Sequence, residues 1–162
     1  MRKGQSDNSE ALVLPAVGEG KRGEQGYLGY LLRQAAAAHR LRMERALGEQ
    51  GVTLPQFLVL TMLGAYPGAS NADLARLSLL TPQTLSVIVG NLLKSGAVER
   101  HPHPVHGRIQ VIELTDQGRA LLDRCRQQVR PYEADLMTGF SDAEEQIIRR
   151  WLVAVAKDAH IE

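Results

Sequence analysis

Residues 70–115 constrain the fold of this chain most strongly, because they predict two closely spaced helices followed by a β-hairpin. Ser70 and Asp73 have the spacing of a capping box, in which a hydroxyl and a carboxylate satisfy the free amides at a helix start. Thr81 followed by Pro82 marks a second start, because proline is well tolerated in the first helical turn. We therefore expect a helix of about two turns, a tight turn and a second helix.

The second expected helix, which ends at Gly96, has one apolar and one polar side. Its apolar positions recur at helical spacing: Leu85, Ile88, Val89, Leu92 and Leu93. Its other side carries polar groups that bond base edges or phosphates: Gln83, Thr84, Ser86, Asn91 and Lys94. Two helices joined by a tight turn form the helix-turn-helix arrangement that enters a major groove. The pattern therefore favours DNA binding.

Two short strands are predicted next, over 97–100 and 109–114, because both segments contain β-branched residues in partial alternation. The segment between them, 101–108, contains prolines and a glycine and is expected to be irregular. A hairpin with a long tip behind a recognition helix is a wing. We expect Arg108 and the histidines of the tip to contact DNA phosphates or a minor groove.

The ordered series 73–76, 81–86, 92–100 and 108–115 resembles the MarR family of winged-helix transcription regulators. The resemblance extends from about Tyr27 to the C-terminus. It implies a homodimer that binds pseudo-palindromic, double-stranded operator DNA as a repressor released by a small molecule. The residues expected to contact DNA are Ser70, Thr81, Gln83, Thr84, Ser86, Asn91, Lys94, Arg100, His106 and Arg108.

The chain departs from the family pattern at several of these positions. Leu79 stands where a glycine is common in the turn, and His106 stands where an acidic residue commonly precedes the wing arginine. Val87 and Gly90 occupy places that are often polar or charged, and Lys94 is the only charged residue from Pro82 to Ser95. We therefore expect an atypical preference among DNA sites.

The expected fold class is mainly α with a small β-hairpin wing. A MarR-like domain covers 26–162, with the winged helix-turn-helix at about 53–115 and dimerisation helices at about 27–50 and 116–160. The terminal helices carry more apolar surface than one winged unit covers. Residues 1–25 are expected to be a disordered tail, because they contain too little apolar surface to offset the entropy of ordering. The alternative is an arm that packs on the partner subunit.

Composition narrows the class of protein and the cellular compartment that the sequence fits. The chain has 162 residues, of which 44% are hydrophobic and 23% charged, values typical of a soluble globular protein. Its net charge is only +1, so DNA binding must depend on the arrangement of charges. Cys125 is the only cysteine, which excludes an intramolecular disulfide and fits a reducing cytoplasm. No apolar stretch or leader pattern suggests a membrane or export.

The family resemblance places an effector site between the dimerisation helices and the winged unit. Its expected lining residues are Tyr30, Arg33, His39, Phe57 and Met62. An Arg or His among aromatic and apolar groups suits a small aromatic carboxylate or phenol. For each of these residues, ordinary packing in the core or at the surface is the alternative.

Other interpretations stay open. His101, His103 and His106 would form a metal site in a metal-responsive regulator, but we expect them to face solvent and phosphate, and we assign no metal or cofactor. Cys125 is either a redox sensor or an inert buried thiol. No catalytic motif is found, so an enzyme is not expected. The alternative to a DNA-binding regulator is a winged-helix protein-interaction module.

Overall fold

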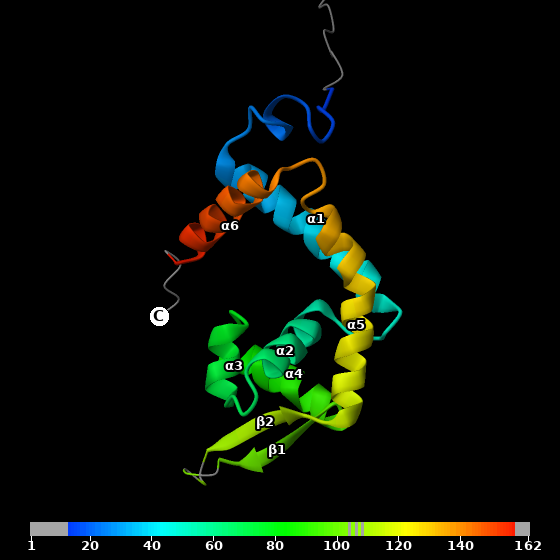
Figure 1. The fold of residues 1–162 in the computed structure, drawn as a ribbon, viewed down its shortest axis with the longest axis vertical. Helices are drawn as coiled ribbons and strands as arrows, with labels where there is room; N and C mark the ends of the chain where they lie inside the picture. Colours follow the sequence, from blue (N-terminus) through cyan, green and yellow to red (C-terminus); the bar gives the residue numbers. More distant parts are fainter. Residues whose placement is uncertain (1–12, 104, 106, 108, 158–162) are drawn as a thin grey trace, which may run out of the picture. The chain divides into compact units, whose positions relative to one another are not determined.

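The protein is represented by a computed structural model that describes residues 13–103, 105, 107 and 109–157 (Figure 1). It divides into two compact units, one ending at His39 and the other beginning at Arg40. Helix α1 (Leu28–Gly48) contributes to both units. The chain is mainly helical with a single two-stranded sheet among the described residues, which confirms the expected fold class.

The first unit contains a 3₁₀ turn, η1 (Gly20–Arg22), and the beginning of α1. The turn is held by local hydrogen bonds, including one of 2.8 Å from the Arg22 guanidinium to the Pro15 carbonyl oxygen. It falls in the part of the chain for which a disordered tail is expected. Residues 1–12 of that tail lie outside the described residues.

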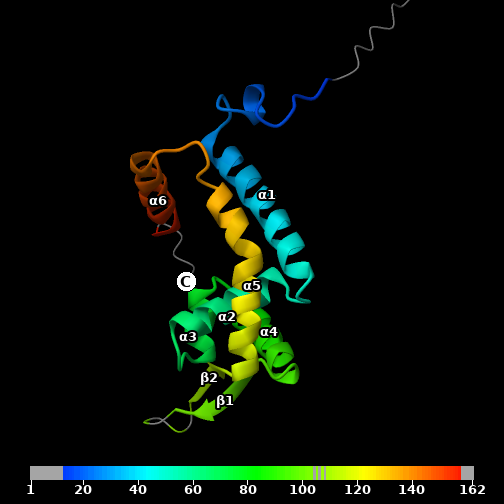
Figure 2. The ribbon, with the colours of Figure 1, turned by 45° about the vertical axis from the view of Figure 1, so that its right-hand side comes forward.

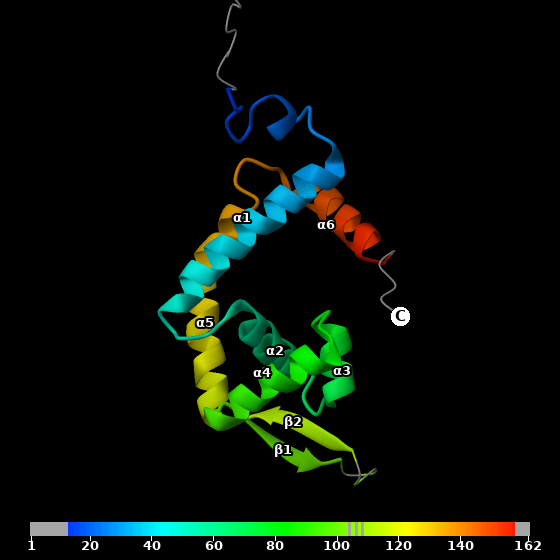
Figure 3. The same cartoon turned by 180° about the vertical axis from the view of Figure 1, so that it is seen from behind.

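The second unit holds the predicted helix-turn-helix. After α2 (Leu54–Ala65) come α3 (Asn71–Leu77) and α4 (Pro82–Lys94), and α2 packs against both. Capping explains where these helices start, because Thr53, Ser70 and Thr81 each accept a hydrogen bond from an amide three residues ahead. The three helices form one group beside the hairpin in every view (Figures 2 and 3).

The hairpin consists of β1 (Val98–Pro102) and β2 (Gln110–Leu114), paired antiparallel with Val98 opposite Leu114. The expectation that His101 and Pro102 belong to an irregular tip is wrong, because both are paired in β1. Proline is tolerated there because it lies at the end of a strand in a two-stranded sheet. An isolated bridge from Ser70 to Val111 also connects β2 to the start of α3.

The core lies where α2, α3, α4 and the hairpin meet. Its fully buried side chains include Val59, Leu60, Leu74, Leu85, Val89 and Ile112. The apolar side predicted for α4 is confirmed, since Leu85, Ile88, Val89 and Leu92 are all buried. Leu77 of α3 does not join this core: it is 39% exposed, because it lies in the last turn of a seven-residue helix.

Two long helices follow the hairpin. Helix α5 (Asp116–Asp135) is capped by Thr115, packs on α2 and buries Leu122, Cys125 and Val129. Helix α6 (Asp142–Lys157), every residue of which the structure describes, buries none of them. Its exposed apolar side chains are Ile147, Trp151, Leu152, Val153 and Val155. Among the described residues, no helix combines the length and the apolarity needed to cross a membrane.

Candidate nucleic-acid interface

The exposed side of α4 is the centre of the candidate interface. Gln83, Thr84, Ser86, Asn91 and Lys94 are all exposed, on the side opposite the buried leucines, isoleucine and valine. Within the part of the chain that the structure describes, Gln83, Ser86 and Asn91 make no side-chain hydrogen bond, so their amides and hydroxyl remain available to a ligand. These groups suit the donors and acceptors of base edges.

The start of α4 is fixed by Thr81. Its hydroxyl accepts a hydrogen bond from the Thr84 amide at 3.2 Å and donates one to the Thr84 hydroxyl at 2.9 Å. Both threonines are exposed, so the residues expected to touch DNA also cap the helix. A capped N-terminus presents its first turn in one conformation, which is the part of a recognition helix that contacts bases.

The turn before α4 adopts an unusual backbone conformation. Leu79 has a φ of +52°, in the left-handed region that favours glycine, and its side chain is 72% exposed. The turn is closed by a hydrogen bond from the Leu80 amide to the Ala75 carbonyl oxygen at 3.0 Å. The sequence shows that leucine stands where a glycine is common in this turn. Only the structure shows that this leucine adopts the left-handed conformation.

Ser70 is both a predicted contact and the cap of α3. Its hydroxyl donates to the Asp73 carboxylate at 2.6 Å and accepts from the Asp73 amide at 3.2 Å. The Arg76 guanidinium also donates to Asp73, at 2.7 Å. The hydrogen bonds from Ser70 and Arg76 lower the pKa of Asp73 below its ordinary value. Arg76 is an exposed cation that sequence reasoning did not select as a contact.

The end of α4 is tied to the start of α5. The Thr115 hydroxyl donates to the Gly96 carbonyl oxygen at 2.6 Å, and the Gln117 side-chain amide donates to the Ser95 carbonyl oxygen at 3.1 Å. Gly118 lies so close to the Ala97 carbonyl that any side chain there would overlap it. The sequence does not predict these links, because no motif marks contacts between residues about twenty positions apart.

The wing is only partly described. Arg100 is exposed on β1, and the imidazole of His101 lies 3.3 Å from the Glu99 carboxylate. His103 is half-buried, and its Nδ1 accepts a hydrogen bond from the Val105 amide at 3.1 Å. The predicted contacts His106 and Arg108 lie outside the described residues. No group of residues suited to hold a metal ion occurs among those that are described.

The predicted effector residues are distributed over both units. In the first unit Tyr30 and Arg33 are exposed and His39 is half-buried, all on α1. In the second unit Phe57 is buried and Met62 is half-buried, both on α2. Each unit is described by itself, so the grouping of these five residues stays a prediction.

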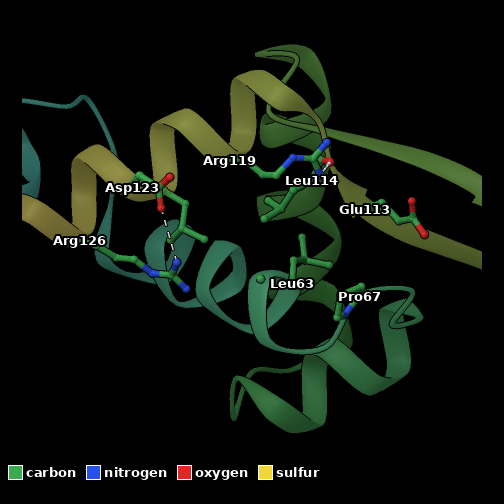
Figure 4. A pocket seen from close by; sticks show the side chains of 9 residues that line it. Leu63, Pro67, Glu113, Leu114, Arg119, Asp123 and Arg126 are labelled. Carbon is green, nitrogen blue, oxygen red and sulfur yellow. Dashed lines mark hydrogen bonds and ion pairs between the residues drawn. The ribbon is translucent and has the colours of Figure 1, made fainter.

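A separate hollow of about 310 Å³ lies inside the second unit, between the end of α2, the end of β2 and α5 (Figure 4). Its lining residues are Leu63, Gly64, Pro67, Glu113, Leu114, Arg119, Leu122, Asp123 and Arg126. Arg119 donates to the Leu114 carbonyl oxygen and to Asp116, each at 2.7 Å, while Arg126 lies 3.6 Å from Asp123. Arg126 is therefore the less firmly held of the two cations. No sequence motif marks this hollow.

Cys125 lies on the buried side of α5 with no exposed surface. Burial raises the pKa of its thiol, although the charge of Arg124 acts in the opposite direction. A thiol with a raised pKa is a poor nucleophile at neutral pH. These observations favour the inert thiol over the redox sensor.

Sequence comparisons identify relatives of this chain. Residues 50–109 match the model of the MarR family. The HTH-type transcriptional repressor Rv2887 of Mycobacterium tuberculosis is 36% identical over 131 residues, which make up 81% of this chain and 94% of that protein.

Solved structures show the same fold. The PcaV transcriptional regulator of Streptomyces coelicolor, solved with its natural ligand, matches 83% of this chain and 94% of its own with a TM-score of 0.73 and 25% identity. Rv2887 bound to DNA matches 80% of this chain and 98% of its own, with a TM-score of 0.65 and 34% identity. Its complex with salicylic acid matches 82% and 98%, with a TM-score of 0.64 and 35% identity. The chain therefore belongs to the MarR family.

Proposed function

We propose that this protein is a homodimeric, sequence-specific DNA-binding repressor that a small aromatic ligand releases from its operator in the cytoplasm. The observation that carries the proposal is the exposed side of α4, where unpaired polar groups line a helix whose two ends are fixed. The DNA complex of its relative Rv2887 supports the same reading. The proposal gives the chain no catalytic role.

Dimerisation supplies the second half of the interface. The exposed apolar side chains of α6 find no cover within the described chain, and a second copy would bury them. Two-fold symmetry then sets two copies of α4 at a fixed separation, which a pseudo-palindromic operator matches.

DNA binding is tested by a mobility shift with the promoter DNA beside the protein's own gene, measured at several salt concentrations. Binding should weaken as salt rises, because contacts to phosphate release counterions. The variant Lys94→Ala should reduce the salt dependence by about one counterion per subunit. Lys21→Ala, the same change at η1, is the matched control and should bind as the wild type does. Arg108→Ala tests the predicted wing contact in the same assay.

The competing interaction module predicts a different result. A folded, dimeric protein that fails to bind duplex DNA even at low salt would contradict the repressor and favour that module. Binding that does not respond to salt would also contradict the phosphate contacts assigned here.

We further propose that the effector is an aromatic carboxylate bound near Tyr30, Arg33, His39, Phe57 and Met62. The salicylic acid complex of Rv2887 supports the ligand class. A cation that pairs with the carboxylate contributes about 1.5–3 kcal/mol, so Arg33→Ala should raise the salicylate concentration that releases DNA by about tenfold or more. Arg126→Ala tests the hollow in Figure 4 as the competing location, because Arg126 is its less firmly held cation. An effect of Arg126→Ala alone would move the effector site to the hollow.

A further inference from the structure

The middle of the exposed side of α4 is apolar, and the predicted polar contacts with DNA do not account for it. Val87 is 65% exposed, halfway along the helix. Gln83, Val87, Gly90 and Lys94 follow one another at spacings of four, three and four residues, so they form one line along the helix surface. This line faces away from the buried side, and its middle consists of Val87 and Gly90.

Neither residue is required by packing within the described chain. Val87 is mostly exposed, and a β-branched side chain in a helix is slightly less favourable than alanine. At Gly90 no atom lies within 4 Å of the place where a side chain would begin, so no neighbour demands a glycine there. Glycine is nevertheless among the poorest residues for a helix interior. The middle of this line is therefore open to a partner from outside the subunit.

The chemistry of this line indicates which base pairs it fits. In a major groove, thymine is distinguished by its 5-methyl group, which apolar side chains contact, and adenine by the paired groups that Gln or Asn bonds. The common contact to guanine uses Arg or Lys, and α4 offers only Lys94, in its last turn. The N-terminal part of a recognition helix is the part that reaches bases. Gln83 lies in the first turn of α4 and Val87 in its first half, whereas Lys94 lies in the last turn.

We propose that Val87 recognises a thymine methyl group in each half-site and that Gly90 provides the clearance for this contact. The inference deepens the proposed function and rests on it. The centre of each half-site is then an A·T pair, which the protein recognises by apolar contact with the thymine. Gln83 or Asn91 forms hydrogen bonds with a neighbouring adenine. The flat profile of Gly90 lets the Val87 methyl groups reach the base edge.

The test uses a duplex selected from a random library by the purified full-length protein. Each thymine of the selected half-site is replaced singly by deoxyuridine, which removes only the 5-methyl group. Binding is measured by fluorescence anisotropy at one fixed salt concentration. At one thymine position the wild type should bind about fourfold more weakly per half-site, the factor expected from one buried methyl group. Changing both half-sites should weaken binding by about fifteenfold.

Variants assign the effect to Val87. Val87→Ala should lower the preference for the thymine duplex over the uracil duplex, because it removes both γ-methyl groups, and Val87→Thr, which replaces only one of them with a hydroxyl, should lower it less. Val17→Ala is the matched control, because Val17 is 74% exposed in the first unit, and it should keep the full thymine preference. Gly90→Ala should weaken binding to every duplex by about tenfold, while its circular dichroism spectrum stays that of the wild type.

The outcomes separate this inference from the function on which it rests. Salt-dependent binding of the selected duplex that is indifferent to every uracil replacement would overturn the thymine contact and leave the repressor intact. Wild-type affinity in Gly90→Ala would overturn the clearance. Failure to select any duplex would contradict the repressor itself, and Val87 would then belong to a protein-docking surface.

Discussion

Thr115 and Gly96 are joined by a hydrogen bond of 2.6 Å from the threonine hydroxyl to the glycine carbonyl oxygen. The same hydroxyl accepts from the Gly118 amide at 3.0 Å, so one oxygen serves both the end of α4 and the start of α5. A movement of α5 would therefore carry the recognition helix with it.

Replacing Thr115 by valine should lower the free energy of unfolding by about 1–3 kcal/mol, because valine keeps the shape but removes the cap and the bond to Gly96. The measurement is urea denaturation at a fixed protomer concentration. Thr115→Ser keeps the hydroxyl and is the matched control. Equal stability of the valine variant and the wild type would show that the link contributes nothing.

Gly118→Ala should destabilise the protein by about 3 kcal/mol or more, because the added methyl group overlaps the Ala97 carbonyl and the backbone must move. Gly48→Ala is the matched control, since open space surrounds Gly48 at the end of α1. Thermal melting followed by circular dichroism compares the two. A Gly118→Ala protein that melts with the wild type would contradict this close approach.

Leu79→Asn should raise the free energy of unfolding by about 1 kcal/mol. Asparagine tolerates the left-handed conformation better than leucine does, and little apolar burial is lost because Leu79 is 72% exposed. Leu77→Asn is the comparison, because Leu77 belongs to α3 and has ordinary helical backbone. Denaturant unfolding should show a higher free energy of unfolding for Leu79→Asn and not for Leu77→Asn. An unchanged free energy of unfolding in both variants would contradict backbone strain at Leu79.

The capping box at Ser70 should make stability sensitive to acid. The pKa of Asp73 is lower in the folded protein, so its contribution is complete above the unfolded pKa of about 3.8 and is lost as pH falls through the folded value. Ser70→Ala should cost about 1 kcal/mol at pH 7. The difference in unfolding free energy between variant and wild type should shrink below about pH 4. A difference that stays constant down to pH 3 would contradict this origin.

Cys125 should react with a thiol reagent only when the protein opens. It is fully buried and its pKa is raised, so both access and thiolate formation are suppressed in the folded state. The rate of labelling by dithionitrobenzoate should rise with urea in parallel with unfolding. Rapid labelling of the native protein would restore the redox-sensor hypothesis.

Local signals explain what the sequence predicted well. The caps at Ser70 and Thr81 depend on residues three positions apart, and the buried side of α4 depends on a regular repeat. Both kinds of signal act within one helix. They were enough to predict the helix-turn-helix and the polar side that carries the candidate contacts.

Tertiary contacts explain what the sequence did not predict. Whether Leu77 is buried depends on what lies beside the end of α3, and Pro102 joins β1 only because Gln110 pairs with it. The close approach of Gly118 to Ala97 and the hollow beside Arg126 also bring together residues distant in sequence. Periodicity and capping carry no information about such distances.

If α6 forms the dimer interface, as proposed above, its lack of buried residues within one subunit ties the stability of this protein to its concentration. When folding and association are one equilibrium, each tenfold dilution of the protomer removes about 1.4 kcal/mol from the apparent stability of the dimer. A cell that keeps only a few copies of a regulator therefore needs a tight dimer simply to keep it folded. Under the proposed dimerisation, the affinity of α6 for its partner thus sets the lowest protein concentration at which the repressor stays folded.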